Sequence, residues 1–225
     1  MRPAVRRRIG WIAIIGILLI GAAELGTGNF PVPVTRHARL PTGPRGEIAR
    51  KIVEGARAEV AHHVRYDASY QLIDYPGGDV PADRGACTDV LVRALRNAGF
   101  DLQQLIHDDM RHHFQLYPQK YGLRGPDSSI DHRRASNHVV FLRRHGKELP
   151  RAIQVWGADA WQPGDLVYWG EDRAPWHCGV ISDRLNAKGL PLVIHNVGGA
   201  REEDVLGMDR IAGHFRFPVN VHTTH

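Results

Sequence analysis

The sequence contains only two cysteines, Cys87 and Cys178, among its 225 residues. This scarcity excludes a small scaffold held together by several disulfides. An even count is compatible with one disulfide, and each cysteine taken singly is a candidate catalytic thiol. Cysteine number therefore leaves both interpretations open, and the position of each cysteine along the chain must decide between them.

Zinc-site patterns are also absent. The chain has 14 histidines but neither a His-Glu-x-x-His motif nor paired Cys-x-x-Cys spacing, and these are the arrangements that bring ligands around one ion. The adjacent histidine pairs, His62/His63 and His112/His113, diverge around a helix axis rather than converge. We expect no metal site and no cofactor.

The sequence likewise lacks the zinc-ligand pattern, the aromatic strand motif and the recognition helix of nucleic-acid-binding modules. Its net charge of +5 is spread along the chain rather than concentrated in one block. Such a charge suits anionic surroundings in general, including an anionic cell wall or lipid headgroups. We therefore expect no nucleic-acid partner.

One long apolar run occurs near the amino terminus, at residues 9–23, and it ends at Glu24. Four arginines precede it: Arg2, Arg6, Arg7 and Arg8. A basic segment followed by an apolar one is typical of export signals. The run is short for a membrane span of about 20 residues, and no clear small-residue cleavage site follows it. We predict that residues 1–30 are a signal peptide or a single inner-membrane anchor, which places the protein in a bacterial cell envelope, on the periplasmic or extracytoplasmic side.

Proline content and apolar spacing divide the rest of the chain. Residues 31–46 contain four prolines and little periodicity, which predicts an extended linker. The 43% hydrophobic content supports one sizeable core. We place this core at residues 47–217, followed by a tail at residues 218–225.

Within that core, helical spacing predicts helices at residues 47–63, 87–98, 101–114 and 137–144. Strand-like segments follow at residues 152–156, 165–169, 177–182, 192–197 and 214–217. Because the helices come first and an antiparallel sheet follows, the predicted fold class is α+β.

Cys87 lies at the predicted start of a buried helix, where exposed N–H groups and the helix dipole favour a thiolate. A nearby imidazole would complete its activation, with a third polar group orienting the ring. The predicted strands offer two candidates, His177 and His195. Side chains alternate along a strand, so His177 and Cys178 should face opposite ways. A Cys87–His177 pair and a Cys87–Cys178 disulfide are thus competing predictions.

Four segments resemble, in order, the sequence blocks of NlpC-type peptidases, which are papain-like cysteine hydrolases of the bacterial cell wall. They are residues 85–99, 162–169, 177–182 and 192–196. More narrowly, residues 74–81, 101–110 and 130–134 resemble an uncharacterised bacterial family within that clan, described as a domain of unknown function. This narrower resemblance extends from Tyr66 to Phe217.

The resemblance implies a papain-like fold, with Cys87 as nucleophile, His177 as base and acid, and His195 as the orienting group. It also implies that the oxyanion rests on the Cys87 N–H and on the Tyr75 hydroxyl. The residues next to Cys87 differ from those usual at this place in NlpC-type peptidases. The helices predicted between residues 101 and 144 form an insertion beyond the compact domain that is usual in that clan. These departures predict a distinct specificity.

The same resemblance suggests the peptide part of peptidoglycan as substrate, cleaved at an amide bond through a thioacyl-enzyme. Two alternatives stay open. One is a different acyl-transfer activity on this scaffold, such as that of an amidase, thioesterase or transpeptidase. The other is a non-catalytic envelope-binding module that contains a Cys87–Cys178 disulfide.

Several polar residues are further candidates for substrate binding. Asp131, His132 and Arg133 form a dense cluster that could bind substrate carboxylates through guanidinium groups. Asp89, beside the nucleophile, could bind a substrate amine. A salt-bridged loop and a helix-capping role explain these residues equally well.

Overall fold

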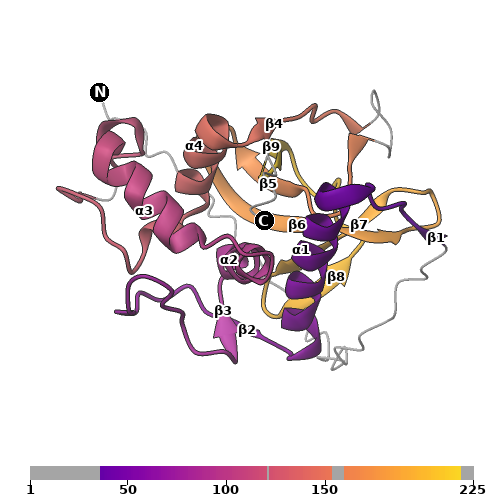
Figure 1. Ribbon diagram of the computed structural model, residues 1–225, viewed down its shortest axis with the longest axis horizontal. Coiled ribbons are helices and arrows are strands. Elements are labelled where there is room, and N and C mark those ends of the chain that lie inside the picture. Colours follow the sequence, from indigo (N-terminus) through magenta and orange to yellow (C-terminus); the bar gives the residue numbers. More distant parts are fainter. Residues whose placement is uncertain (1–35, 121, 154–159, 219–225) are drawn as a thin grey trace, which may run out of the picture. The chain divides into compact units, whose positions relative to one another are not determined.

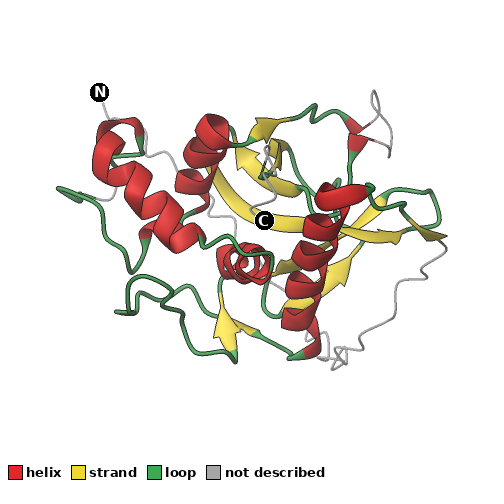
Figure 2. Ribbon diagram, in the orientation of Figure 1, coloured by secondary structure: helices red, strands yellow, loops and turns green. Residues whose placement is uncertain are grey.

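The computed structural model describes residues 36–120, 122–153 and 160–218. Within these ranges, four α-helices and a seven-stranded antiparallel sheet make up most of the structure (Figures 1 and 2). The predicted α+β class is confirmed. The predicted signal or anchor at residues 1–30 lies outside the described residues, as does most of the predicted tail.

The helices are arranged along the first two thirds of the chain. Their bounds are α1 Gly43–Ala61, α2 Cys87–Asn97, α3 Leu102–His113 and α4 Ala135–His145. Short 3-10 turns lie at Phe114–Leu116 and Asp131–Arg133. None of the helices in the described part of the chain combines the length and apolar character that crossing a bilayer requires.

The main sheet has the strand order β4-β9-β5-β6-β7-β8, and β1 also pairs with β6. Its bounds are β1 Arg36–His37, β4 Lys147–Glu148, β5 Leu166–Glu171, β6 Ala174–Leu185, β7 Pro191–Asn196, β8 Ala200–Glu203 and β9 Ile211–Arg216. A separate parallel pair consists of β2 Arg65–Tyr66 and β3 Arg84–Gly85. The strand β6 therefore lies between β5 and β7, well inside the sheet.

The folded part begins earlier than the sequence indicated. The strand β1 pairs with Arg184 and Leu185 of β6, and α1 starts at Gly43 rather than near residue 47. Pro44 lies in the first helical turn, where its missing N–H costs no hydrogen bond. Part of the segment predicted as a linker, residues 36–46, is thus structured.

Two differences concern strands. Of the strand predicted at residues 152–156, only Ala152 and Ile153 are described, and neither lies in a strand. The strand β8 was not predicted, because its sequence is polar and lacks an alternating apolar pattern. It lies at one edge of the sheet, where charged residues are common since they discourage pairing with other chains.

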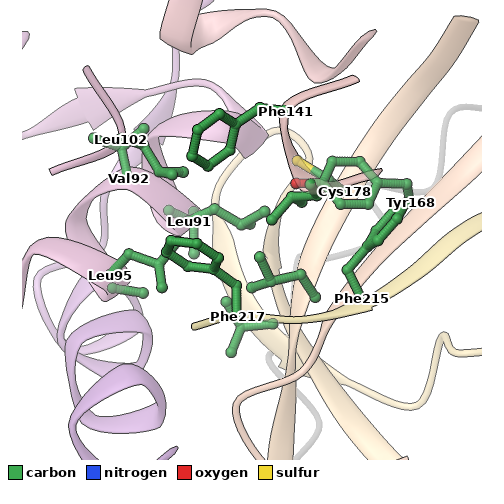
Figure 3. Packing of buried hydrophobic residues seen from close by; sticks show 14 of the residues in the cluster. Leu91, Val92, Leu95, Leu102, Phe141, Tyr168, Cys178, Phe215 and Phe217 are labelled. Carbon is green, nitrogen blue, oxygen red and sulfur yellow. The ribbon is translucent and has the colours of Figure 1, made fainter. Parts of the chain in front are cut away.

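Both faces of the sheet are covered by apolar residues. On one face, Tyr168, Cys178 and Phe215 pack against side chains from the helices, including Leu91 and Phe141 (Figure 3). On the other face, a smaller cluster surrounds two tryptophans; its buried members are Trp161, Val167, Trp169, Ile181, Val193 and Leu206. Burial on both sides holds β6 rigidly against α2.

Candidate active site

Cys87 is the first residue of α2, and only Ala86 separates it from the end of β3. The backbone N–H of Ala86 donates to Asp89 Oδ2 at 2.6 Å, which closes the turn ahead of the helix. The first N–H groups of a helix have no partners within the helix and carry partial positive charge. Cys87 is buried, with 6% of its surface exposed, and its place at the helix start favours the thiolate.

A buried ion pair holds this turn in place. Arg133 donates through Nε to Asp89 Oδ1 at 2.9 Å, and its other nitrogens donate to the carbonyls of Ser69 and Asp67. Thr88 Oγ1 donates to the Arg133 carbonyl at 3.1 Å. The Arg133 and Asp89 side chains are only 1% and 3% exposed. The structure therefore assigns both residues to the structural role that the sequence left open, and not to a surface facing substrate.

A second tether joins the nucleophile turn to the sheet. Asn196, at the end of β7, donates to the Gly85 carbonyl at 2.9 Å and to the Val64 carbonyl at 3.4 Å. The Ala200 N–H also donates to the Val64 carbonyl. Sequence analysis missed this function of Asn196; its only signal is a polar residue directly after His195, at the end of an apolar strand.

His177 lies on β6 and is 1% exposed. Its ring is stacked near two indoles: the centroid distance is 5.5 Å to Trp169 and 5.2 Å to Trp176. Trp176 is fixed by a hydrogen bond from Nε1 to Asp209 Oδ2 at 2.8 Å. These contacts give the imidazole one orientation.

The two predicted histidines are in direct contact. His177 Nε2 lies 2.9 Å from His195 Nδ1. Burial, and then the positive charge of His177, lower the pKa of His195 to about 4, so His195 is neutral at pH 7 and its Nδ1 accepts a hydrogen bond from Nε2–H of His177. Glu203 Oε2 lies 3.9 Å from the other nitrogen of His195, Nε2. This leaves Nδ1 of His177 for the sulfur.

Cys87 lies close enough to Cys178 and His177 for both side chains to affect the pKa of its thiol. Hydrogen bonding from the Cys178 thiol lowers the pKa of Cys87; burial opposes this shift, and the hydrogen bond and charge of His177 add to it. Burial and the neighbouring Cys87 raise the pKa of Cys178. Both cysteines are free thiols in this structure.

This arrangement corrects the expectation that only one of His177 and Cys178 could reach Cys87. The pairing of β5 with β6 shifts register between Trp169 and Gly170, beside the Trp169–His177 pair. The shift lies beyond the pair, so the two residues keep regular alternation: Cys178 packs in the cluster against the helices, and His177 stacks on Trp169 of the other cluster. Both nevertheless lie close enough to Cys87 to affect the pKa of its thiol.

Two tyrosines near the nucleophile turn differ in their surroundings. The Tyr75 hydroxyl donates to Asp108 Oδ1 on α3 at 3.0 Å. Tyr66 pairs in register with Gly85, two residues before Cys87. Burial, and then the negative charge of Cys87, raise the pKa of Tyr66. Nothing in the sequence around Tyr66 signalled this position.

Asp131 and His132 lie inside the protein beside the base of α4, 1% and 2% exposed. Burial raises the pKa of Asp131 to about 6 and lowers that of His132 to about 3. The Asp127 N–H donates to Asp131 Oδ2, and His138 binds the His132 carbonyl. Neither side chain presents a charge to solvent.

The described residues were also searched for a metal site and for a cavity near the predicted site residues. Among residues 36–120, 122–153 and 160–218, no group of three His, Cys, Asp or Glu side chains could hold a metal ion. A cavity of about 460 Å³ lies between the end of the Phe114–Leu116 turn, α4 and the β5–β6 connection. Its lining includes Ser136, Arg143 and Arg173 but none of Cys87, His177 and His195.

Comparison with known proteins agrees with the expected match to a domain of unknown function. The chain is 47% identical over 167 residues to "Uncharacterized protein YijF" of Escherichia coli (strain K12), an alignment that covers 74% of this chain and 80% of that protein. Residues 53–217, which include Cys87, His177 and His195, match the family described as "Domain of unknown function (DUF1287)". The chain belongs to this DUF1287 family.

Proposed function

We propose that this protein is a cysteine hydrolase of the papain-like, NlpC-type clan that cleaves an amide bond in the peptide part of peptidoglycan. The observation that carries the proposal is that Cys87 begins α2, that His177 lies close enough to influence its thiol, and that His177 contacts His195. A thiolate at a helix start, an imidazole beside it and a polar group that orients the imidazole are the three parts of a thiol-based acyl-transfer site.

In the acylation step, the Cys87 thiolate attacks the amide carbonyl. The developing oxyanion is stabilised by the backbone N–H of Cys87 at the helix start. The protonated His177 transfers its Nδ1 proton to the leaving amine, and a thioacyl-enzyme remains. Throughout this step Nε2–H of His177 donates to the neutral His195.

In the deacylation step, neutral His177 removes a proton from water. The resulting hydroxide attacks the thioester, the carboxylic acid product leaves, and Cys87 returns as the thiolate beside protonated His177. Stacking on Trp169 and Trp176 keeps the imidazole in place through both proton transfers. The cycle needs no metal or cofactor.

The substrate class rests on the resemblance to wall hydrolases and on location. The basic residues ahead of the apolar run at residues 9–23 are typical of exported proteins. A net charge of +5 would favour association with an anionic wall. The inner membrane would be a second partner if residues 9–23 remain as an anchor.

The test is digestion of purified sacculi by residues 31–225, beside the Cys87→Ser variant, with released fragments identified by mass spectrometry. We expect peptide-containing fragments from the wild-type protein and none from the variant, and the new ends name the cleaved bond. Equal release by the folded Cys87→Ser protein would sink the proposal. If reduced, folded wild-type protein releases no fragments, peptidoglycan is not the substrate, and the proposal changes to another acyl substrate.

A further inference from the structure

The cavity between α4 and the β5–β6 connection combines an apolar wall with two cations. Its volume is about 460 Å³, which is within the range of small-ligand sites. Leu116, Val139 and Val140 supply apolar side chains, and Arg143 and Arg173 supply the charges. The described residues that line the cavity include no aspartate or glutamate. The cavity therefore favours an anionic ligand that also has an apolar part.

One wall of the cavity is a single face of α4. Four lining residues lie on it: Ser136, Val139, Val140 and Arg143. Residues three or four positions apart are neighbours on a helix surface. Arg143 Nε lies 3.5 Å from Glu148 Oε2, whereas Arg151 approaches the same carboxylate to 2.7 Å. Glu148 thus has a closer partner, and Arg143 keeps hydrogen-bond donors for a ligand.

Another wall includes Arg173, which is exposed in the turn between β5 and β6. The two carboxylates before it already have partners. Glu171 pairs with Arg210 at 2.9 Å. Asp172 pairs with Arg151 at 2.9 Å and with Arg210 at 3.2 Å. Within the described part of the chain, no residue forms a hydrogen bond or ion pair with Arg173, so its guanidinium is available to a ligand.

The two kinds of lining residue specify the chemistry of that ligand. A guanidinium binds a carboxylate through two parallel hydrogen bonds. Leu116 is 50% exposed, and covering it with an aliphatic group removes apolar surface from water. A carboxylate and an aliphatic side chain are joined to the same carbon at the carboxyl end of a peptide. Such an end matches both parts of the cavity.

The elements that form the cavity also hold the proposed active site. Arg173 precedes His177 by four residues in the β5–β6 hairpin. The helix α4 starts at Ala135, two residues after Arg133. The Arg133 carbonyl accepts from Thr88 Oγ1 at 3.1 Å, and Thr88 is the residue after Cys87.

We propose that this cavity binds the carboxyl-terminal residue of a peptide, with its carboxylate at Arg143 and Arg173 and an aliphatic side chain against Leu116. The proposal rests on the proposed function in one respect, because it takes the ligand to be a peptide substrate or product of the same protein. Binding itself requires no turnover, so the two proposals can fail separately.

The test compares two ligands that differ in charge at one end, N-acetyl-alanyl-leucine and its carboxyl-terminal amide. Titration followed by backbone amide NMR gives the Kd and the residues whose signals move. The full-length Cys87→Ser protein is used, so that no ligand is cleaved. N-acetyl-glycyl-glycine tests the apolar wall, and inorganic phosphate tests whether any anion binds equally well.

The variants, made in the same protein, are Arg143→Gln, Arg173→Gln, the double variant and Leu116→Ser. Arg184→Gln is the matched control for the loss of one positive charge. Arg184 lies on β6, is 40% exposed and pairs with Glu202 at 2.9 Å, and it does not line the cavity.

We expect the acid to bind at least about tenfold more tightly than the amide. Each arginine variant should lose about tenfold in affinity for the acid and little for the amide, the scale of one hydrogen bond to a charged group. Leu116→Ser should weaken binding of the leucine ligand but not of the glycine ligand. Arg184→Gln should bind like the unsubstituted protein, and signals from residues 136–143 and 171–174 should move.

Equal affinities for acid and amide would overturn the inference, as would acid binding that survives in the double arginine variant. Inorganic phosphate that binds as tightly as the acid would overturn it too, because the cavity would then select charge alone. These results leave the proposed function standing, since that depends on fragment release by Cys87. Conversely, absence of Cys87-dependent release with selective acid binding intact would remove the proposed function and keep the cavity as a peptide-binding site.

Discussion

Two polar clusters are conspicuous in the sequence, and we propose opposite roles for them from their surroundings in the structure. The reaction cluster is Cys87, His177 and His195; the turn cluster is Asp131, His132 and Arg133. In the reaction cluster, His177 contacts His195, and the Cys178 thiol and His177 lower the pKa of Cys87. In the turn cluster, the charges are neutralised or paired inside the protein.

The difference shows that a high density of charged residues does not identify a site. The turn cluster supports the reaction cluster. Arg133 donates to Asp89, and the Arg133 carbonyl accepts from Thr88 Oγ1. Thr88 and Asp89 are the two residues that follow Cys87. A buried pair of this kind is a poor binding surface, since its hydrogen-bonding capacity is already used. It can, however, fix the position of a nucleophile.

Substituting one histidine in each cluster should give the sharpest contrast. His177→Ala removes the base and the acid, so fragment release from sacculi should fall by about 10³-fold or more with the fold intact. His132→Ala should keep release within about tenfold of wild type, because position 132 contacts no reacting atom. Equal inactivation by a folded His132→Ala protein would break the distinction between the clusters.

The buried ion pair gives the next largest expected effect. Arg133→Met leaves Asp89 buried without its partner, so the free energy of unfolding in urea should fall by about 3–5 kcal/mol. The control is Arg143→Met, whose arginine pairs with Glu148 at 3.5 Å on the surface and should cost about 1 kcal/mol or less. Similar losses in both variants would contradict the structural role of Arg133.

Acidification should destabilise the protein chiefly through buried neutral histidines. Burial lowers the pKa of His132 to about 3, and those of His138 and His195 to about 4. An unfolded histidine titrates near 6.5, so between pH 6.5 and 4 the unfolded chain binds more protons and stability falls as pH falls. Asp131 opposes this trend, because its pKa is raised to about 6 and the folded state binds its proton first.

His138 alone should contribute up to about 3 kcal/mol to this loss. The measurement is the free energy of unfolding at several pH values between 6.5 and 4, in wild type and His138→Gln. The variant should show a shallower slope. A wild-type protein whose stability is flat or increases toward pH 4 would show that these rings are protonated in the folded state.

The smallest effect concerns the orientation of His177. The amide oxygen of asparagine can occupy the place of His195 Nδ1, which accepts from His177, whereas that of glutamine reaches the place of Nε2. We expect His195→Asn to retain most of the fragment-release rate and His195→Gln to lose about 10–100-fold, the usual scale for misplacing a catalytic group. A higher rate in His195→Gln than in His195→Asn would show that the important contact of His195 is made through its Nε2.

The parts of this molecule that sequence predicted are those with strong local signals. The helix that starts at Cys87 has a turn before it and a glycine after it, and the strands with His177 and His195 are apolar. The confirmed α+β class follows from such segments. Short strands that pair with distant segments have no recognisable sequence pattern of their own. For this reason β1, β2, β3, β4 and β8 were not predicted.

The same limit applies to the site. Cys87, His177 and His195 stand out as residue types in an ordered pattern. Tyr66 and Asn196 reach the nucleophile turn only through long-range pairing, which spacing along the chain cannot reveal. Alternation along β6 predicted that only one of His177 and Cys178 would approach Cys87, and the spacing of residues could not show that both lie near its thiol.

The most direct test of the central claim is to titrate activity against modification of Cys87. Wild-type protein is treated at pH 6 with increasing iodoacetamide, the labelled fraction of each cysteine is measured by peptide mass spectrometry, and the initial rate of fragment release is recorded. The account predicts that Cys87 is labelled while the buried Cys178 is not, and that the rate falls in proportion to the labelled fraction. Unchanged release from protein fully labelled at Cys87 would contradict it.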